Sequence, residues 1–237
     1  MISIINWAGT SSDDLRVRIE SYPVRVLPER SQTETEIPGR NGALLIVDGN
    51  WKNYTQEYEV FISAEKQGLV RAARAVVEWL ESPVGYQRLE DSYEPDVYRE
   101  AFYEGGQDIE SILNRFGRAT IAFNCKPQRY LKSGEVAQTF TASGTLTNIT
   151  RFDALPLITV NGSGAGTVTI NSNTVTISAI DGYVVLDCEL MDAYKGTTNK
   201  NSTVTLTEFP VLAPGANTIS FGGGVTSLEI VPRWWTI

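Results

Sequence analysis

Apolar and polar residues alternate with a period of two over three stretches of the first half of the chain. Residues 14–19, 56–62 and 119–125 place side chains such as Leu15, Tyr58 and Ile121 on one side and mostly polar side chains on the other. Successive side chains of a strand point to opposite faces, so the pattern predicts strands with one buried and one wetter face.

A helical period appears once with clarity. Between about residues 65 and 81, apolar residues recur every three or four positions, and the Ser-Pro pair at 82–83 ends the pattern. We predict one helix there, with these residues on its buried face: Leu69, Ala72, Ala73, Val76, Val77 and Leu80. A second, short helical turn is predicted at residues 108–114.

The last hundred residues consist of short β-branched or aromatic runs separated by turn-forming pairs such as Asn-Gly and Asp-Gly. Seven such runs in this length predict a two-sheet sandwich. The best-defined hairpin joins Val168 and Ile170 to Val175 and Ile177 across residues 171–173. The glycine-rich residues 162–166 are expected to form a hairpin loop, because the strand that follows rules out a phosphate-binding glycine loop, which must open a helix.

Charge density divides the chain into two predicted domains. Residues 1–134 contain 16 Lys and Arg against 20 Asp and Glu, whereas residues 135–237 contain 4 against 8. We expect a mainly β protein with a minor α component: a β-sandwich or split-barrel-like domain with one helix at residues 1–134, and a second β-sandwich at residues 135–237. Residues 28–42 are expected to form a long polar loop.

Composition restricts the possible partners. The formal charge is −8, whereas binding to nucleic acid or to an anionic membrane requires clustered cations, so we expect neither partner. The start of the chain lacks the features of a signal peptide, and no stretch approaches the roughly 20 apolar residues of a membrane span, so the protein is expected to fold in a cytosol. Cys125 and Cys188 lie in apolar runs and are predicted to be buried free thiols.

Residues for catalysis are scarce. The chain has no histidine, which excludes Ser-His-Asp and Cys-His catalysis and histidine zinc sites, so no enzymatic activity, metal or cofactor is expected. An acid/base pair of carboxylates is the remaining option, with two candidate groups: Glu90, Asp91, Glu94 and Asp96, then Glu34 and Glu36. Nothing in their spacing selects a pair, and we interpret both groups as parts of solvated loops.

Aromatic residues allow two interpretations. Trp234 and Trp235, Trp51 with Tyr54 and Tyr58, and Tyr93 with Tyr98 could stack on sugar rings, but packing in cores or subunit interfaces is favoured. Adjacent tryptophans on a strand point to opposite faces, so one of the pair at 234–235 needs a neighbour outside the domain core. A subunit interface would provide it.

Taken in order, a series of short segments resembles the distal tail protein family of siphophages. In the first part these are residues 37–42 (IPGRNG), 77–80 (VEWL), 95–98 (PDVY), 117–119 (GRA) and 121–127 (IAFNCKP). In the second part they are residues 155–158 (LPLI), 162–164 (GSG), 185–189 (VLDCE), 209–212 (FPVL), 214–219 (PGANTI) and 229–234 (EIVPRW).

The resemblance implies a structural protein at the distal end of a phage tail, assembled in the bacterial host cytoplasm. It implies a homohexameric ring formed by the N-terminal domains, with the tail tube protein on one side, a tail-associated tip or fibre protein on the other, and galectin-like C-terminal sandwiches outside. A ring requires one patch to meet a different patch on the next copy. We expect those patches at the 28–42 loop and the sheet edges nearby, with these candidate residues: Pro38, Gly39, Arg40, Trp51, Tyr58 and Trp235.

Two other functions remain open from the sequence. The C-terminal sandwich could be a carbohydrate-binding or lectin module for host cell-wall glycans. The acidic residues around Glu90 and Asp91 could instead belong to a glycoside hydrolase.

Overall fold

The computed structural model describes residues 3–64, 68–105, 109–112 and 116–237. The chain divides into two compact units, one of Met1–Arg129 with Ile237 and one of Tyr130–Thr236. Strands dominate both units, and the described residues contain one α-helix, so the predicted mainly β fold with a minor α component is confirmed. The units divide between Arg129 and Tyr130, within strand β10 (Phe116–Leu131), a few residues before the position at which charge density changes.

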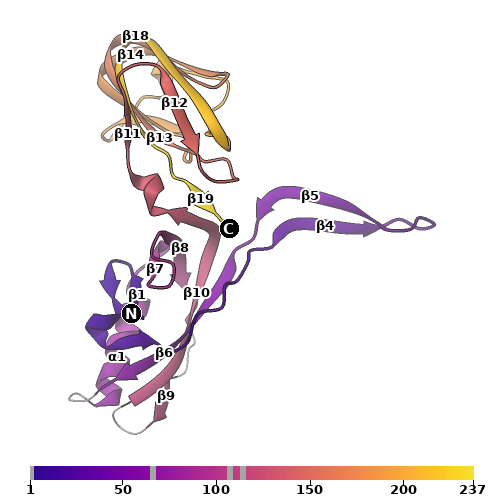
Figure 1. Ribbon diagram of the computed structural model, residues 1–237, viewed down its shortest axis with the longest axis vertical. Helices are drawn as coiled ribbons and strands as arrows, with labels where there is room; N and C mark the ends of the chain where they lie inside the picture. Colours follow the sequence, from indigo (N-terminus) through magenta and orange to yellow (C-terminus); the bar gives the residue numbers. More distant parts are fainter. Residues whose placement is uncertain (1–2, 65–67, 106–108, 113–115) are drawn as a thin grey trace. The chain divides into compact units, whose positions relative to one another are not determined.

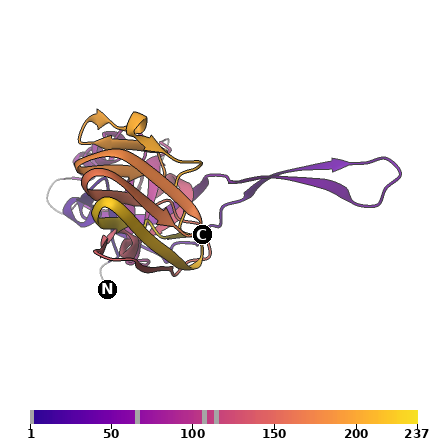
Figure 2. The ribbon, with the colours of Figure 1, turned by 90° about the horizontal axis from the view of Figure 1, so that it is seen from above.

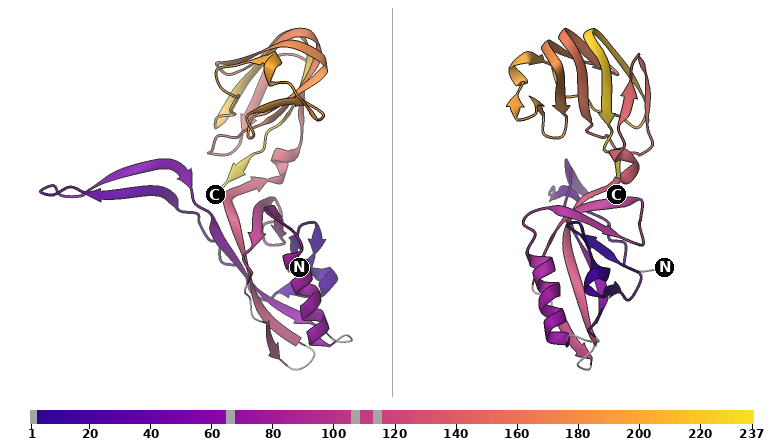
Figure 3. Two further views of the ribbon diagram at one scale, coloured as in Figure 1. Left: turned by 180° about the vertical axis from the view of Figure 1, so that it is seen from behind. Right: turned by 90° about the vertical axis from the view of Figure 1, so that its left-hand side faces the viewer.

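Unit 1 is built on one antiparallel sheet whose strands follow the order β2-β1-β7-β8-β10-β6-β3, with β9 also paired to β10. Helix α1 (Leu69–Glu81) lies beside this sheet (Figure 3). It packs Val76, Trp79 and Leu80 into the core of this unit. The other strands are β1 (Ile5–Trp7), β2 (Thr10–Ser11), β3 (Val17–Ile19), β6 (Tyr54–Ser63), β7 (Gln87–Asp91), β8 (Val97–Tyr103) and β9 (Ile109–Ile112).

The predicted alternation holds in the long central strands. β6 buries Tyr58, Val60 and Ile62, and β10 buries Ile121, Phe123 and Cys125, as their patterns indicate, although Ala122 on the opposite face of β10 is buried as well. The first predicted strand is shorter than expected, because Asp14 and Leu15 belong to the 3-10 helix η1 (Ser12–Leu15) and only β3 is extended.

The predicted helix is confirmed as α1, although its expected start at residues 65–67 lies outside the described residues. Val77 is exposed, and Trp79 takes a place in the core. The second helical turn, predicted at residues 108–114, is wrong where the chain is described, because Ile109–Ile112 is strand β9 paired with β10. Pairing with a long neighbouring strand outweighs a weak local preference.

A two-stranded ribbon replaces most of the loop predicted at residues 28–42. β4 (Arg30–Glu36) pairs antiparallel with β5 (Ala43–Trp51), and the turn between them covers residues 37–42. The loop prediction is therefore wrong for residues 30–36, which are extended although they face no core. We call β4, β5 and their turn the arm (Figure 1 and Figure 2).

Unit 2 is an antiparallel sheet in the order β11-β18-β13-β14-β15-β16, with β12 also paired to β18 and β17 to β14. The sheet curls on itself (Figure 3). It encloses a core that includes Ile158, Val175 and Leu228. Its elements are η2 (Lys132–Glu135), β11 (Gln138–Phe140), β12 (Gly144–Asn148), β13 (Leu157–Ile170), β14 (Asn173–Asp187), β15 (Asp192–Lys195), β16 (Thr198–Asn199), η3 (Asn201–Thr203), β17 (Val204–Thr205), β18 (Gly215–Val231) and β19 (Trp235–Thr236).

The long strands β13, β14 and β18 each contain two of the seven short strands predicted from the sequence. The two parts of each long strand are separated by a bulge and not by a turn. The register between β13 and its two neighbours shifts over residues 162–166, so these glycines lie inside a strand and not in a hairpin loop as predicted. A Cβ on Gly162 would lie 2.1 Å from the Gly224 carbonyl oxygen, so only glycine allows this close approach. Bulges bend strands, which lets one sheet curl around its own core. The predicted hairpin is confirmed, with Val168 opposite Val175.

Candidate assembly surface

Strand β5 of the arm has an exposed apolar surface of the kind found on strands at subunit interfaces. Leu44, Leu45, Ile46 and Val47 follow one another on β5, and each is 46–50% exposed. Since neighbouring side chains of a strand point to opposite sides, both faces of β5 present apolar groups to solvent. A solitary two-stranded hairpin is marginal in water, and an exposed apolar strand invites pairing with another chain.

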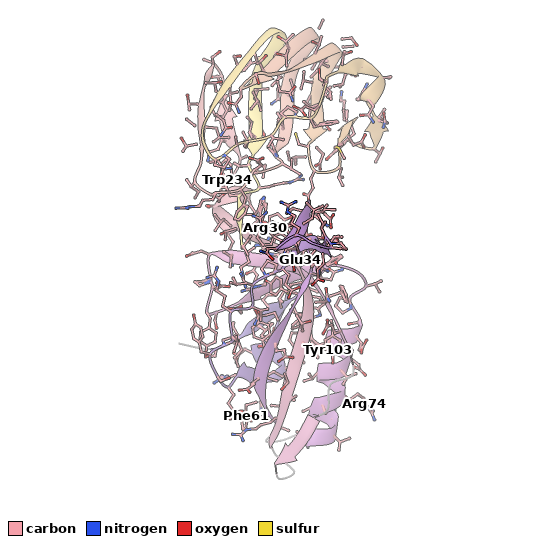
Figure 4. The ribbon with its side chains drawn as sticks, turned by 90° about the vertical axis from the view of Figure 1, so that its right-hand side faces the viewer. Arg30, Glu34, Phe61, Arg74, Tyr103 and Trp234 are labelled. Atoms are coloured by element: carbon pink, nitrogen blue, oxygen red, sulfur yellow. The ribbon has the colours of Figure 1, made fainter. Side chains whose placement is uncertain are left out.

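Polar contacts hold the arm together at its base. The Ser31 hydroxyl donates to Asp48 Oδ2 at 2.7 Å, and the Arg30 guanidinium lies 4.3 Å from the centre of the Trp51 ring. Figure 4 shows Arg30 and Glu34 on this ribbon. Trp51, an interface candidate from the sequence, thus contacts Arg30 within the arm. Strand β4 carries the exposed carboxylates Glu34 and Glu36.

The other candidate residues have different environments. Pro38, Gly39 and Arg40 form the exposed tip of the arm, where Gly39 has φ +81°. Tyr58 is fully buried in unit 1 and has no surface to offer a neighbouring copy, so its choice from the sequence is wrong. Trp235 has a neighbour within its own unit: its ring stacks on Phe152 with centroids 4.4 Å apart, and its Nε1 donates to the Asp153 carbonyl at 2.8 Å.

The chain enters the arm through residues 21–29, which we call the root segment. Gln56, Arg129 and Glu94 are among the side chains of unit 1 that hold it. Gln56 Nε2 donates to the Val24 carbonyl at 3.0 Å, Arg129 Nη2 donates to the Val26 carbonyl at 2.8 Å, and Glu94 Oε1 lies 3.1 Å from Arg25 Nη1.

A cluster of buried charged residues lies beneath the root segment. The interpretation of the acidic residues around Asp91 as parts of solvated loops is therefore wrong for Asp91 itself, which is buried. Asp91 Oδ2 lies 3.0 Å from Arg99 Nη1 and accepts the Tyr58 hydroxyl at 2.8 Å, while Asp91 Oδ1 accepts the backbone N–H groups of Tyr93 and Glu94. Burial raises the pKa of Tyr58 well above its usual value, so its hydroxyl keeps the proton that it donates. The oxygens of Asp91 are therefore engaged in structural bonds, which argues against a role for it as a catalytic base.

Other candidate chemistry is also accounted for by internal contacts. Glu90 bonds to Arg88, Arg88 lies over the Tyr98 ring at 3.8 Å, and Tyr93 packs edge-on against Tyr22 at 4.7 Å. Trp234 is buried in the core of unit 2. The described residues contain no group of three or more His, Cys, Asp or Glu side chains placed to hold a metal ion.

The two cysteines are buried and free, as predicted. Burial raises the pKa of Cys125 and of Cys188 to about 12, so both thiols stay protonated at neutral pH. Among the helices of the described chain, none has the length and apolar character needed to cross a membrane.

The fold of this chain is similar to that of a solved phage protein. That protein is SPP1 Dit (gp 19.1), described as a paradigm of the hub adsorption apparatus in phages that infect Gram-positive bacteria. The TM-score is 0.81 at 13% sequence identity, and the similarity covers 100% of both chains. No model of a protein family matches the sequence, and no curated protein matches it either. The likeness therefore concerns the fold, and the fold expected from the resemblance to distal tail proteins is confirmed.

Proposed function

We propose that this chain is a structural hub at the tip of a long, non-contractile phage tail. It forms a hexameric ring that joins the tail tube protein to the tail-associated tip protein, and it has no catalytic role. Three features support the proposal: the fold shared with SPP1 Dit over the full length, the order of the sequence segments that resemble distal tail proteins, and the exposed arm.

The arm is the observation that carries self-assembly. Its apolar β5 lacks a cover among the described residues of its own chain, and its neighbour β4 is polar and almost entirely exposed. A closed ring uses a patch that meets a different patch on the next copy, and a projecting arm supplies one half of such a contact.

Sedimentation velocity and negative-stain images of the purified full chain test this function. We expect a closed ring that forms with increasing concentration. A chain that stays monomeric up to about 1 mM, at which even a contact of about 4 kcal/mol is detectable, would contradict the proposal.

A shortened arm provides the matched variant. Gln32 pairs directly with Val47, so replacing residues 33–46 by Asn-Gly closes the ribbon with a two-residue turn and leaves its base intact. This variant should remain folded, because the removed residues belong to no core, and it should be monomeric. A ring formed by the shortened chain would show that the arm is dispensable.

A further inference from the structure

We propose that Glu94 is a positioning residue for assembly, because it fixes the root segment and thereby sets the direction in which the arm leaves unit 1. This inference rests on the proposed self-assembly through the arm. It concerns the cluster of Glu94 with Asp91, Arg25, Arg99 and Arg129, which serves no catalytic purpose in the proposed function.

Glu94 is itself rigidly held. Its backbone N–H donates to Asp91 Oδ1 at 2.9 Å, and its carboxylate accepts a hydrogen bond from Arg99 Nη2. Asp91 and Arg99 are each almost fully buried and bonded to one another at 3.0 Å. A carboxylate placed in this way has little freedom to move, so a group bonded to it is also fixed.

Glu94 faces three guanidinium groups. Besides Arg99, its carboxylate lies 3.1 Å from Arg25 of the root segment and 3.7 Å from Arg129 Nε. Arg129 is fully buried and in turn bonds the Val26 carbonyl. The two carboxylates of the cluster are thus shared among three cations, and loss of the Glu94 charge would leave Arg25, Arg99 and Arg129 close together with Asp91 alone to compensate.

Apolar packing holds the root segment at Val26, which packs against the core of unit 1, and at Pro28, which is buried, but other apolar side chains of the segment face solvent. Tyr22, Val24 and Leu27 are strongly exposed, and a cavity of about 60 Å³ lies between the segment and the sheet, lined by residues that include Arg25, Glu94 and Arg99. That space is large enough for water. Around Arg25 the segment is attached chiefly through the Glu94 ion pair and the bonds from Gln56 and Arg129, and also through Arg25 Nη2, which donates to the Ile237 backbone oxygen at 2.9 Å.

Arm direction can be measured with spin labels. Asn41→Cys places a label at the arm tip, and Arg74→Cys places one on the outer face of α1, where Figure 4 shows Arg74 pointing away from the sheet. The native cysteines are buried and should not react. Pulsed electron resonance on the dilute full chain then gives the width of the tip-to-helix distance distribution.

Glu94→Gln should widen this distribution at least about twofold, since a segment freed from its ion pair samples more orientations. Arg25→Gln should act likewise from the side of the root segment, and because Arg25 is half exposed this variant stays informative if Glu94→Gln does not fold. The matched control is Glu104→Gln, which removes a carboxylate that accepts hydrogen bonds from Thr55 and Asn124 on the same unit. Its distribution should equal that of the unmodified arm.

Self-association of the same variants completes the test. If the arm points correctly only a tenth of the time, the apparent affinity falls about tenfold, and we expect that loss in Glu94→Gln and Arg25→Gln but not in Glu104→Gln. Unchanged widths in both variants would overturn the proposal, as would wider distributions with undiminished association. Failure of the unsubstituted chain to associate would instead refute the proposed function, while the label widths would still show whether Glu94 holds the root segment.

Discussion

Replacing the apolar residues on one face of β5 should weaken self-association without unfolding the monomer. Leu44 and Ile46 share one face, and Leu45 and Val47 share the other. The double variants Leu44→Thr/Ile46→Thr and Leu45→Thr/Val47→Thr place β-branched threonine at each position, which suits a strand.

The magnitude follows from the exposed fractions. Full burial of a Leu, Ile or Val side chain is worth about 1.5–3 kcal/mol. These four are about half exposed, so covering the remainder gains about half of that for each, and threonine retains one methyl group. Each double variant should therefore lose about 1–2 kcal/mol per subunit contact, which is about 5–30-fold in affinity.

Sedimentation over a concentration series measures that loss, and thermal unfolding checks that the monomer is unchanged within about 0.5 kcal/mol, as expected for exposed positions. Ile149→Thr/Leu190→Thr is the control, because both residues are exposed apolar positions of unit 2, at 68% and 70%. If only one face of β5 contacts the next copy, only one double variant should lose affinity. If both faces of β5 are covered, both double variants should lose affinity. Normal association of both folded arm variants would refute the reasoning.

Three further predictions concern unit 2 within the full chain. Gly224→Ala should abolish its native fold, because a Cβ would lie 1.8 Å from the Ser163 carbonyl oxygen, whereas Gly164→Ala, at φ +77° in open space, should cost only about 1–2 kcal/mol; urea unfolding separates the two. Trp235→Ala should lower the free energy of unfolding by about 2–3 kcal/mol through loss of the Phe152 stack, and Trp235→Phe by about 1 kcal/mol, in the same assay; equal losses would show that the stack contributes nothing. Although burial alone would raise the pKa of Asp187, hydrogen bonds from Arg233 lower it below its usual value. The stability from this pair is therefore present at neutral pH and lost as the pH falls through that lowered pKa, below about 3.9, so Asp187→Asn should flatten the acid limb of a plot of Tm against pH.

Sequence patterns predicted those parts of the fold that face a core. The alternation of Tyr58, Val60 and Ile62 identifies β6 because one side of that strand is buried, and the spacing of Val76 and Leu80 identifies α1 for the same reason. The prediction for residues 162–166 of unit 2 is wrong because these glycine-rich residues have the composition of a turn. The pairing of the strands shows that glycine lets the backbone at residue 162 lie against Gly224. These two residues are far apart in the sequence, so the contact cannot be predicted from local composition.

The arm and the charged cluster could not be found in this way. β4 and β5 bury neither face, so the usual signal of alternation is missing. The signal available was the run of five apolar residues from Ala43 to Val47, between Gly42 and Asp48. Arg99 and Asp91 look like surface residues because charged side chains are seldom buried unless they are paired. Their pairing requires β7 and β8 to be placed side by side, which sequence spacing does not reveal.

The asymmetry of the arm suggests how an exposed apolar strand avoids indiscriminate pairing. Open edges with apolar side chains promote aggregation, and charged residues at an edge oppose it. β4 carries Glu34 and Glu36 along one edge of the ribbon, whereas β5 carries the apolar run along the other. Two arms meeting through their β4 edges would bring like charges together, so that arrangement is disfavoured. Contact through β5 is therefore the favourable way for the arm to bind another copy. Because the root segment fixes the direction of β5, the surface that it binds must lie in one direction, as a closed ring requires.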